Sequence, residues 1–212
     1  MRYTIFSVDD SRKHYTDAIR QTLSDWEEVP ALAVDGRIPA ELAKAQDIHR
    51  YPVNYLSQYG SPLVGQLGIW YGVLNALEYA PIVTIEDDAI LGHDFHFHWR
   101  NRLTYIPKDA DFFSLFLPRD SDHMFNKARA VNNVVTPTYQ RYGGVSMYYT
   151  EKGANNIKAL LDRDGITGQY DDTLYRYSQL GELKGYCSRP EHSDLVYITG
   201  SEKSIVQESE YA

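Results

Sequence analysis

The sequence predicts an α/β fold with a largely parallel central sheet. Short β-branched and aromatic runs end at turn residues, and segments with apolar residues at helical spacing lie between them. Strands that alternate with helices favour parallel pairing, because the connection between two parallel strands must cross back over the sheet. The 212 residues are 43% hydrophobic and 24% charged, as in an ordinary globular protein. We find no internal repeat, low-complexity tract or linker.

The N-terminal third is predicted to contain two strands and two helices. Residues 3–8 form an apolar run that ends at an Asp-Asp pair, and residues 11–26 carry apolar side chains at helical spacing. A second short strand is predicted over residues 29–34, because an Asp-Gly pair follows it. A short helix is predicted over residues 39–45.

The rest of the chain continues the alternation. Residues 63–77 have helical spacing, and residues 82–85 are the clearest strand, because they are β-branched and follow a proline. The remaining predictions are strands over 112–117 and 142–150, the latter after a turn at Gly143-Gly144, and helices over 153–161 and 171–177.

Composition narrows the classes of function. The formal charge of −8, from 29 acidic and 21 basic residues, counts against a nucleic-acid binder, which needs a basic surface. Cys187 is the only cysteine, so no intrachain disulfide can form and a reducing compartment fits best. No apolar stretch is long enough to cross a bilayer, and the N-terminus does not resemble a signal peptide. We therefore predict one cytoplasmic domain over residues 1–200, followed by a polar tail over 201–212.

The strongest local signal is the acidic triplet Glu86-Asp87-Asp88 at the end of the strand over 82–85. Adjacent carboxylates repel one another unless a positive charge lies beside them. In open α/β sheets the carboxyl ends of strands form the ligand crevice, and Mg²⁺ and Mn²⁺ prefer carboxylate oxygens. The triplet alone is equally compatible with a divalent cation site and with a solvated acidic turn.

Several segments carry a family resemblance by their order along the chain. They are the opening strand with Arg12, the Asp-Gly at 35–36, Gly-Gln-Leu-Gly at 65–68, Ile-Glu-Asp-Asp at 85–88, the strand and helix at 143–154, Tyr-Asp-Asp-Thr-Leu at 170–174 and Pro-Glu-His at 190–192. In this order, residues 3–206 resemble glycosyltransferase family 25, which includes lipopolysaccharide and collagen galactosyltransferases.

The chain departs from the family pattern within one predicted helix. Gln66 stands where family members carry glutamate, Ile69 where they carry cysteine, and Tyr71-Gly72 where they carry Ser-His. The pocket beside this helix is therefore expected to differ, so the resemblance does not carry over the choice of donor or acceptor.

The resemblance implies a GT-A glycosyltransferase fold with a Rossmann-like sheet, which binds a nucleotide-sugar, a UDP-sugar above all, through a Mn²⁺ or Mg²⁺ ion. It implies that Asp88, Glu86 and His192 are metal ligands. Nucleotide-binding positions implied in the same way are Ser7, Arg12, Asp35, Gln66, Glu86 and Asp87.

Asp171 and Asp172 are the candidates for the catalytic base. Inverting sugar transfer needs a group that accepts the proton of the acceptor hydroxyl, and a carboxylate suits this role. Asp171 matches the aspartate of the family better, so Asp172 is the reserve candidate. Carboxylates at a helix start are also stabilised by the helix dipole, so a plain N-cap competes with this interpretation.

Other interpretations remain open. The acceptor can be a glycan, a lipid-linked glycan, a protein or a modified base in viral DNA, although the acidic charge counts against the last. A catalytically inactive nucleotide-sugar-binding domain is a further alternative. His93, His96 and His98 are interpreted as surface residues, because no separated second pair of ligands accompanies them as in a zinc site.

Overall fold

Within the residues that the computed structural model describes (1–8, 10–30, 32–54, 64–117, 127–138, 144–192 and 195–198), a seven-stranded sheet is flanked by helices. In chain order the elements are β1 (Arg2–Phe6), η1 (Asp10–Arg12), α1 (Lys13–Thr22), β2 (Glu27–Glu28), α2 (Pro39–His49), α3 (Val64–Leu77), β3 (Ile82–Glu86), β4 (Ala89–Leu91), α4 (Phe95–Tyr105), β5 (Phe112–Ser114), η3 (Lys127–Arg129), β6 (Val135–Pro137), β7 (Ser146–Tyr149), α5 (Glu151–Asp164), α6 (Tyr170–Gln179), β8 (Gly185–Ser188), η4 (Pro190–His192) and β9 (Val196–Ile198).

The main sheet is mixed rather than largely parallel. Its strand order is β2-β1-β3-β7-β5-β8-β6. β1 pairs in parallel with β2 and β3, and β5 pairs in parallel with β8, whereas β7 runs antiparallel between β3 and β5 and β6 runs antiparallel beside β8. The predicted α/β class is confirmed. The carboxyl ends of β1 and β3 still meet at one edge, because these neighbours are parallel.

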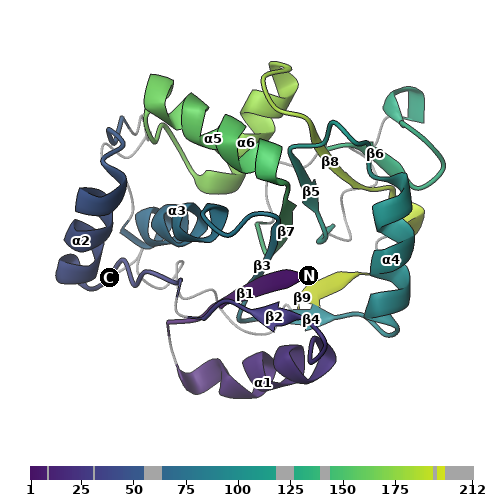
Figure 1. Ribbon diagram of the computed structural model, residues 1–212, viewed down its shortest axis with the longest axis horizontal. Coiled ribbons are helices and arrows are strands. Elements are labelled where there is room, and N and C mark those ends of the chain that lie inside the picture. The colour runs from purple at the N-terminus through teal and green to yellow at the C-terminus, as the bar shows by residue number, and fades with distance from the viewer. Residues whose placement is uncertain are drawn as a thin grey trace.

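Helices cover both faces of the sheet (Figure 1). α3, α5 and α6 pack with Ile82 and Tyr149 on one face, and α1 and α4 pack with Val83 and Ile85 on the other. Adjacent residues of β3 thus face opposite layers, which follows from the alternation of side chains along a strand. Burial on both faces explains why β3 is a continuous apolar run in the sequence.

The predicted strand over residues 29–34 is wrong. β2 is only Glu27–Glu28; the N–H of Val29 still donates to the carbonyl of Tyr3 in β1 at 2.8 Å, but Leu32 and Val34 belong to the apolar layer that contains helix α3. The carbonyl of Leu32 accepts a hydrogen bond from the Asn75 side chain, at 3.1 Å. Apolar spacing here reflected burial against a helix, which the sequence pattern does not distinguish from burial in a sheet.

Other boundaries differ by a few residues. The first predicted helix divides into η1 and α1 and ends at Thr22, and the strand predicted over 112–117 ends at Ser114. Beyond it, Phe116 forms a bridge with Val196, next to the small antiparallel sheet of β4 and β9. The helices predicted from residues 39, 63, 153 and 171 are confirmed as α2, α3, α5 and α6.

Some predictions fall outside the described residues, namely the tail over 201–212 and the Gly143 half of the predicted turn. Among the described residues, no helix has both the length and the apolar character needed to cross a membrane.

Candidate functional site

A pocket lies at the carboxyl ends of β1 and β3. Phe6 and Glu86 are the last residues of these strands and are directly paired across the sheet. The pocket is lined by residues from both strand ends, from segment 33–37 and from α3: Phe6, Val8, Arg12, Ala33, Val34, Asp35, Gly36, Arg37, Gly65, Gly68, Ile69, Gly72, Glu86, Asp87 and Asp88. This is the crevice position expected for a ligand site in an α/β sheet.

Glycines allow segment 33–37 to lie directly against α3. A Cβ atom added to Gly68 would lie 2.5 Å from the carbonyl oxygen of Val34, and one added to Gly36 would clash with the carbonyl of Val64. Both positions therefore require glycine for close backbone packing. The result is a wall of the pocket built from segment 33–37 and the first turns of α3.

Arg12 neutralises part of the acidic triplet. Its Nη1 donates to Oδ1 of Asp87 at 2.8 Å and lies 3.5 Å from Oδ2 of Asp88. Arg12 and Asp87 are only 7% and 5% exposed, so the pair is shielded from water. The repulsion expected within the triplet is thus relieved by a guanidinium that follows β1 by a few residues. Asp87 is the carboxylate most fully committed to this contact.

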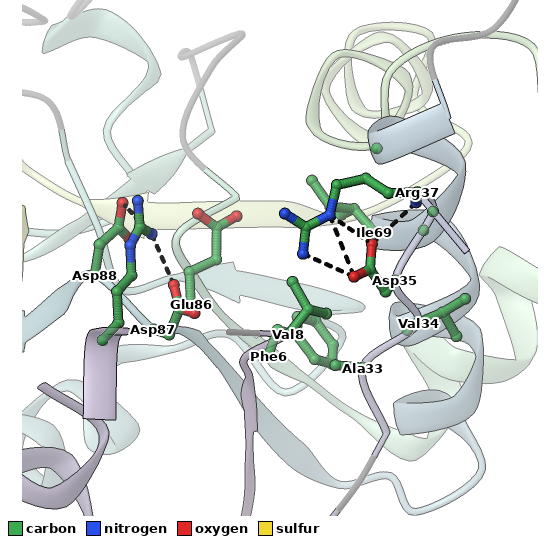
Figure 2. A pocket seen from close by; sticks show the side chains of 15 residues that line it. Phe6, Val8, Ala33, Val34, Asp35, Arg37, Ile69, Glu86, Asp87 and Asp88 are labelled. Atoms are coloured by element: carbon green, nitrogen blue, oxygen red, sulfur yellow. Dashed lines mark hydrogen bonds and ion pairs between the residues drawn. The ribbon is translucent and has the colours of Figure 1, made fainter. Parts of the chain in front are cut away.

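Glu86 lies between the charged groups of the pocket (Figure 2). Burial raises the pKa of its carboxyl to about 8, and the negative charges of Asp88, Asp171 and Asp87 add to this effect, against an opposing effect of Arg12. A carboxyl with this pKa is mostly protonated at neutral pH.

Asp35 and Arg37 form a second ion pair at the other end of the pocket (Figure 2). Arg37 donates to both carboxylate oxygens of Asp35, with Nε–Oδ1 at 2.9 Å and Nη2–Oδ2 at 2.7 Å. These bonds hold the pKa of Asp35 below its usual value, so this carboxylate is ionised. The backbone N–H of Asp35 donates to Glu41 at 3.1 Å, which further fixes the pair.

Asp171 approaches the triplet from the first turn of α6. Its charge raises the pKa of Glu86, and the charges of both residues add to the effect of burial in raising the pKa of Tyr149 on β7. The N-cap of α6 is Gln169, so Asp171 lies inside the helix and is not its cap. The tertiary fold thus brings Asp171 and Glu86 together, although 85 positions separate them in the sequence (171 − 86).

Gly144 makes room for this approach. A Cβ atom there would lie 2.8 Å from the Tyr170 ring and 3.8 Å from Cβ of Asp171. Tyr170 is buried and packs edge-on against Trp70, so its ring has little freedom to move away. The glycine before β7 therefore permits the start of α6 to lie against this end of the sheet.

The other residues predicted to bind the nucleotide or the metal, Ser7, Gln66 and His192, are not among the residues that line the pocket. Ser7 is half-buried, and Gln66 is buried on α3. His192 lies in η4, where its backbone carbonyl accepts a hydrogen bond from Arg102 at 2.9 Å. Within the described parts of the chain, no three His, Cys, Asp or Glu side chains stand in position to hold a metal ion. Ligation by His192 stays a prediction.

His93 lies just before α4, and His96 and His98 lie within it. His93 is exposed, and His96 and His98 are half-buried. His96 bonds the carbonyl of Thr22 through Nε2, at 2.6 Å. This contact ties α4 to the end of α1 and gives His96 a structural role.

Sequence reasoning missed Arg37 and the aromatic floor residue Phe6. Arg37 directly follows the Asp-Gly pair that was recognised, so an adjacent opposite charge was the available signal. Phe6 was assigned to a strand, and only the position of the strand end places its ring at the pocket.

No protein-family model matches the chain, and no curated protein matches it either.

Proposed function

We propose that the protein is a cytoplasmic glycosyltransferase of the GT-A type. It uses Mn²⁺ or Mg²⁺ and transfers a hexose from a nucleotide-sugar, preferably a UDP-sugar, to an acceptor hydroxyl with inversion at the anomeric carbon. The acceptor is a glycan, a lipid-linked glycan, a protein or a modified base.

One observation carries the proposal: the carboxylates of β3 and α6 converge beside a pocket. Glu86 and Asp88 line the pocket, and Asp171 is close enough to perturb the pKa of Glu86. A structural acidic turn needs no second carboxylate from a remote helix, because each added negative charge raises the energy of the cluster. Sugar transfer needs carboxylates at both places: those of β3 hold the cation that binds the leaving diphosphate, and that of α6 accepts the proton of the incoming hydroxyl.

The donor atoms of the pocket fit a hard divalent cation. Arg12 engages Asp87 most closely, which leaves Glu86 and Asp88 as the better candidates for holding the ion. Mg²⁺ is commonly held by one or two carboxylates, with substrate phosphates completing its coordination. Two protein carboxylates are therefore sufficient if the diphosphate of the donor supplies the rest. When bound, the cation supplies positive charge to the leaving diphosphate.

The chain's own residues provide the remaining steps. Arg12 holds Asp87 and keeps the turn after β3 in one conformation. Asp171 accepts the proton of the acceptor hydroxyl as its oxygen attacks the anomeric carbon, and the bond from this carbon to the diphosphate oxygen breaks on the opposite face.

A donor screen tests the proposal. The wild-type protein is incubated with UDP-, GDP- and dTDP-sugars and Mn²⁺, and release of the nucleoside diphosphate is followed over time. We expect release from at least one donor, which Asp88→Ala abolishes while Asp162→Ala, a change of an exposed carboxylate on α5, leaves it unchanged. Circular dichroism of both variants verifies the fold.

Two outcomes would point elsewhere. Binding of a UDP-sugar without any release, with or without acceptor mixtures, would favour the inactive nucleotide-sugar-binding domain. The direct contact of Arg12 with Asp87 is the observation that makes this second function worth testing, because a guanidinium can hold the triplet without a metal. No binding of any nucleotide would reject both.

A further inference from the structure

The pocket has an ion pair at each end, and between them lie the Glu86 carboxyl and a mostly apolar surface (Figure 2). Arg12 with Asp87 and Asp88 forms one end, and Asp35 with Arg37 forms the other (Figure 2). The middle is lined by apolar side chains and by glycines: Phe6, Val8, Ala33, Val34, Gly65, Gly68, Ile69 and Gly72. A ligand that spans the pocket therefore meets one ion pair, then the apolar surface with Glu86 at its side, then the second ion pair.

This polarity orients a nucleotide. The diphosphate belongs at the end with Asp88, where a divalent cation offsets the carboxylates. The nucleoside then extends over the apolar middle toward Arg37, and an apolar floor suits the flat face of a base.

Gly72 supports this orientation. A Cβ atom at this position would meet only ordinary contacts, at 3.5 Å from the Leu32 carbonyl and from the Phe6 ring. Protein packing therefore does not require glycine here, although glycine inside a helix costs about 1 kcal/mol relative to alanine. The missing side chain keeps the floor beside Phe6 open for a ligand.

Arg37 is held with one edge turned toward the pocket. Its Nε and Nη2 groups bond Asp35, whose side chain is 12% exposed, whereas the Arg37 side chain is 42% exposed. Figure 2 shows the guanidinium directed across the pocket toward Glu86. A fixed guanidinium loses little entropy on binding, and all its polar groups are hydrogen-bond donors.

On the basis of the proposed function, we propose that Arg37 selects the base of the nucleotide. It donates to O4 of uracil or O6 of guanine and discriminates against cytosine and adenine, which carry an amino group at the corresponding position. Uracil and guanine present an acceptor at this position, whereas cytosine and adenine present an amino donor. A guanidinium opposite an amino group leaves both donors without an acceptor, which weakens binding.

Calorimetric titration with UDP, GDP, CDP and ADP in the presence of Mn²⁺ tests the inference. We expect the wild-type protein to bind UDP or GDP roughly tenfold to a hundredfold more tightly than CDP and ADP. Arg37→Gln, which can donate and accept, removes most of this ratio. Arg37→Lys retains a positive charge beside Asp35 and also lowers the ratio, because it lacks the planar edge.

Arg20→Gln is the matched control. Arg20 makes a similar two-pronged contact with Glu28 and is 45% exposed, but it lies outside the pocket. This variant should keep the wild-type ratio. Thermal unfolding shows which variants fold. If Arg37→Gln does not fold, the comparison of Arg37→Lys with the wild type tests the inference.

The titrations separate two kinds of failure. If Arg37→Gln weakens all four nucleotides equally, Arg37 binds the phosphates and the inference is wrong; no change with any nucleotide overturns it as well. Equal wild-type affinity for keto and amino bases rejects base selection but leaves the glycosyltransferase proposal standing. No wild-type binding of any of the four rejects both. Separate arms for UDP and GDP identify which keto base the pocket takes.

Discussion

Replacing Glu86 by glutamine is expected to stabilise the protein at neutral and alkaline pH. Burial and nearby carboxylates raise the pKa of Glu86 from 4.5 to about 8. A raised pKa in the folded state contributes stability below pH 4.5 that is lost as the pH rises through 8. Glutamine keeps the shape of the protonated acid and never ionises, so the variant avoids this loss.

The magnitude follows from proton linkage. Between the two pKa values, the stability difference between variant and wild type should grow by about 1.4 kcal/mol per pH unit. For a pKa shift of this size, the stability difference between variant and wild type has an upper limit of roughly 5 kcal/mol above pH 8. Water has access to the half-buried Glu86 side chain, which lowers the observed difference.

Urea denaturation of both proteins at about pH 5, 7 and 9 measures the difference. Glu151→Gln, at an exposed position on α5, serves as the control and should follow the wild type at each pH. Parallel pH profiles for wild type and Glu86→Gln would show that the folded protein does not hold Glu86 in its neutral form. The assignment of a shielded acidic cluster would then be wrong.

Three further predictions concern the groups around Glu86. Arg12→Met should destabilise the protein by roughly 3–5 kcal/mol in urea denaturation, because it leaves the buried Asp87 without its cation; a loss below about 1 kcal/mol would contradict a buried pair. Gly144→Ala should reduce turnover while nucleotide affinity in calorimetry is retained, because the added methyl group displaces Tyr170 and the start of α6 but lies outside the pocket; unchanged turnover would separate Asp171 from the chemistry. EDTA should weaken UDP binding, since the carboxylates of the pocket repel a diphosphate without a cation, and equal affinity with and without EDTA would remove the metal from the mechanism.

A fourth prediction in this group concerns the catalytic base. Asp171→Asn should leave donor binding nearly unchanged and lower turnover on the order of a hundredfold to ten-thousandfold, as measured by nucleotide release with acceptor. Asp172→Asn is the matched neighbour. If only the second variant is inactive, the base is Asp172.

Sequence patterns predicted the central strand and the helices other than α4, because these elements have strong local signals. α3 and β3 each combine an apolar pattern with a clear boundary, so their identity follows from a short window of the chain. The segment after β2 was assigned wrongly for the opposite reason. Its apolar residues face α3, and no local feature distinguishes a helix as the packing partner from a neighbouring strand.

The antiparallel direction of strand β7 could not be predicted from the sequence either. A strand's own residues are compatible with either direction of pairing, and the direction depends on where the chain re-enters the sheet. β7 begins beside the carboxyl end of β3, and Gly144, just before it, lies against the start of α6. The predicted parallel sheet was therefore correct only for part of the strand pairs.

By itself, the sequence determined that an acidic triplet follows a buried strand, and it left open whether that end of the sheet is a cation site or a solvated acidic turn. Only the tertiary structure decided which groups lie beside the triplet. Arg12 contacts Asp87 because β1 and β3 are parallel neighbours, and the charge of Asp171 acts on Glu86 because Gly144 lets the start of α6 approach. Electrostatic coupling depends on distance in space and on burial, and neither follows from spacing along the chain.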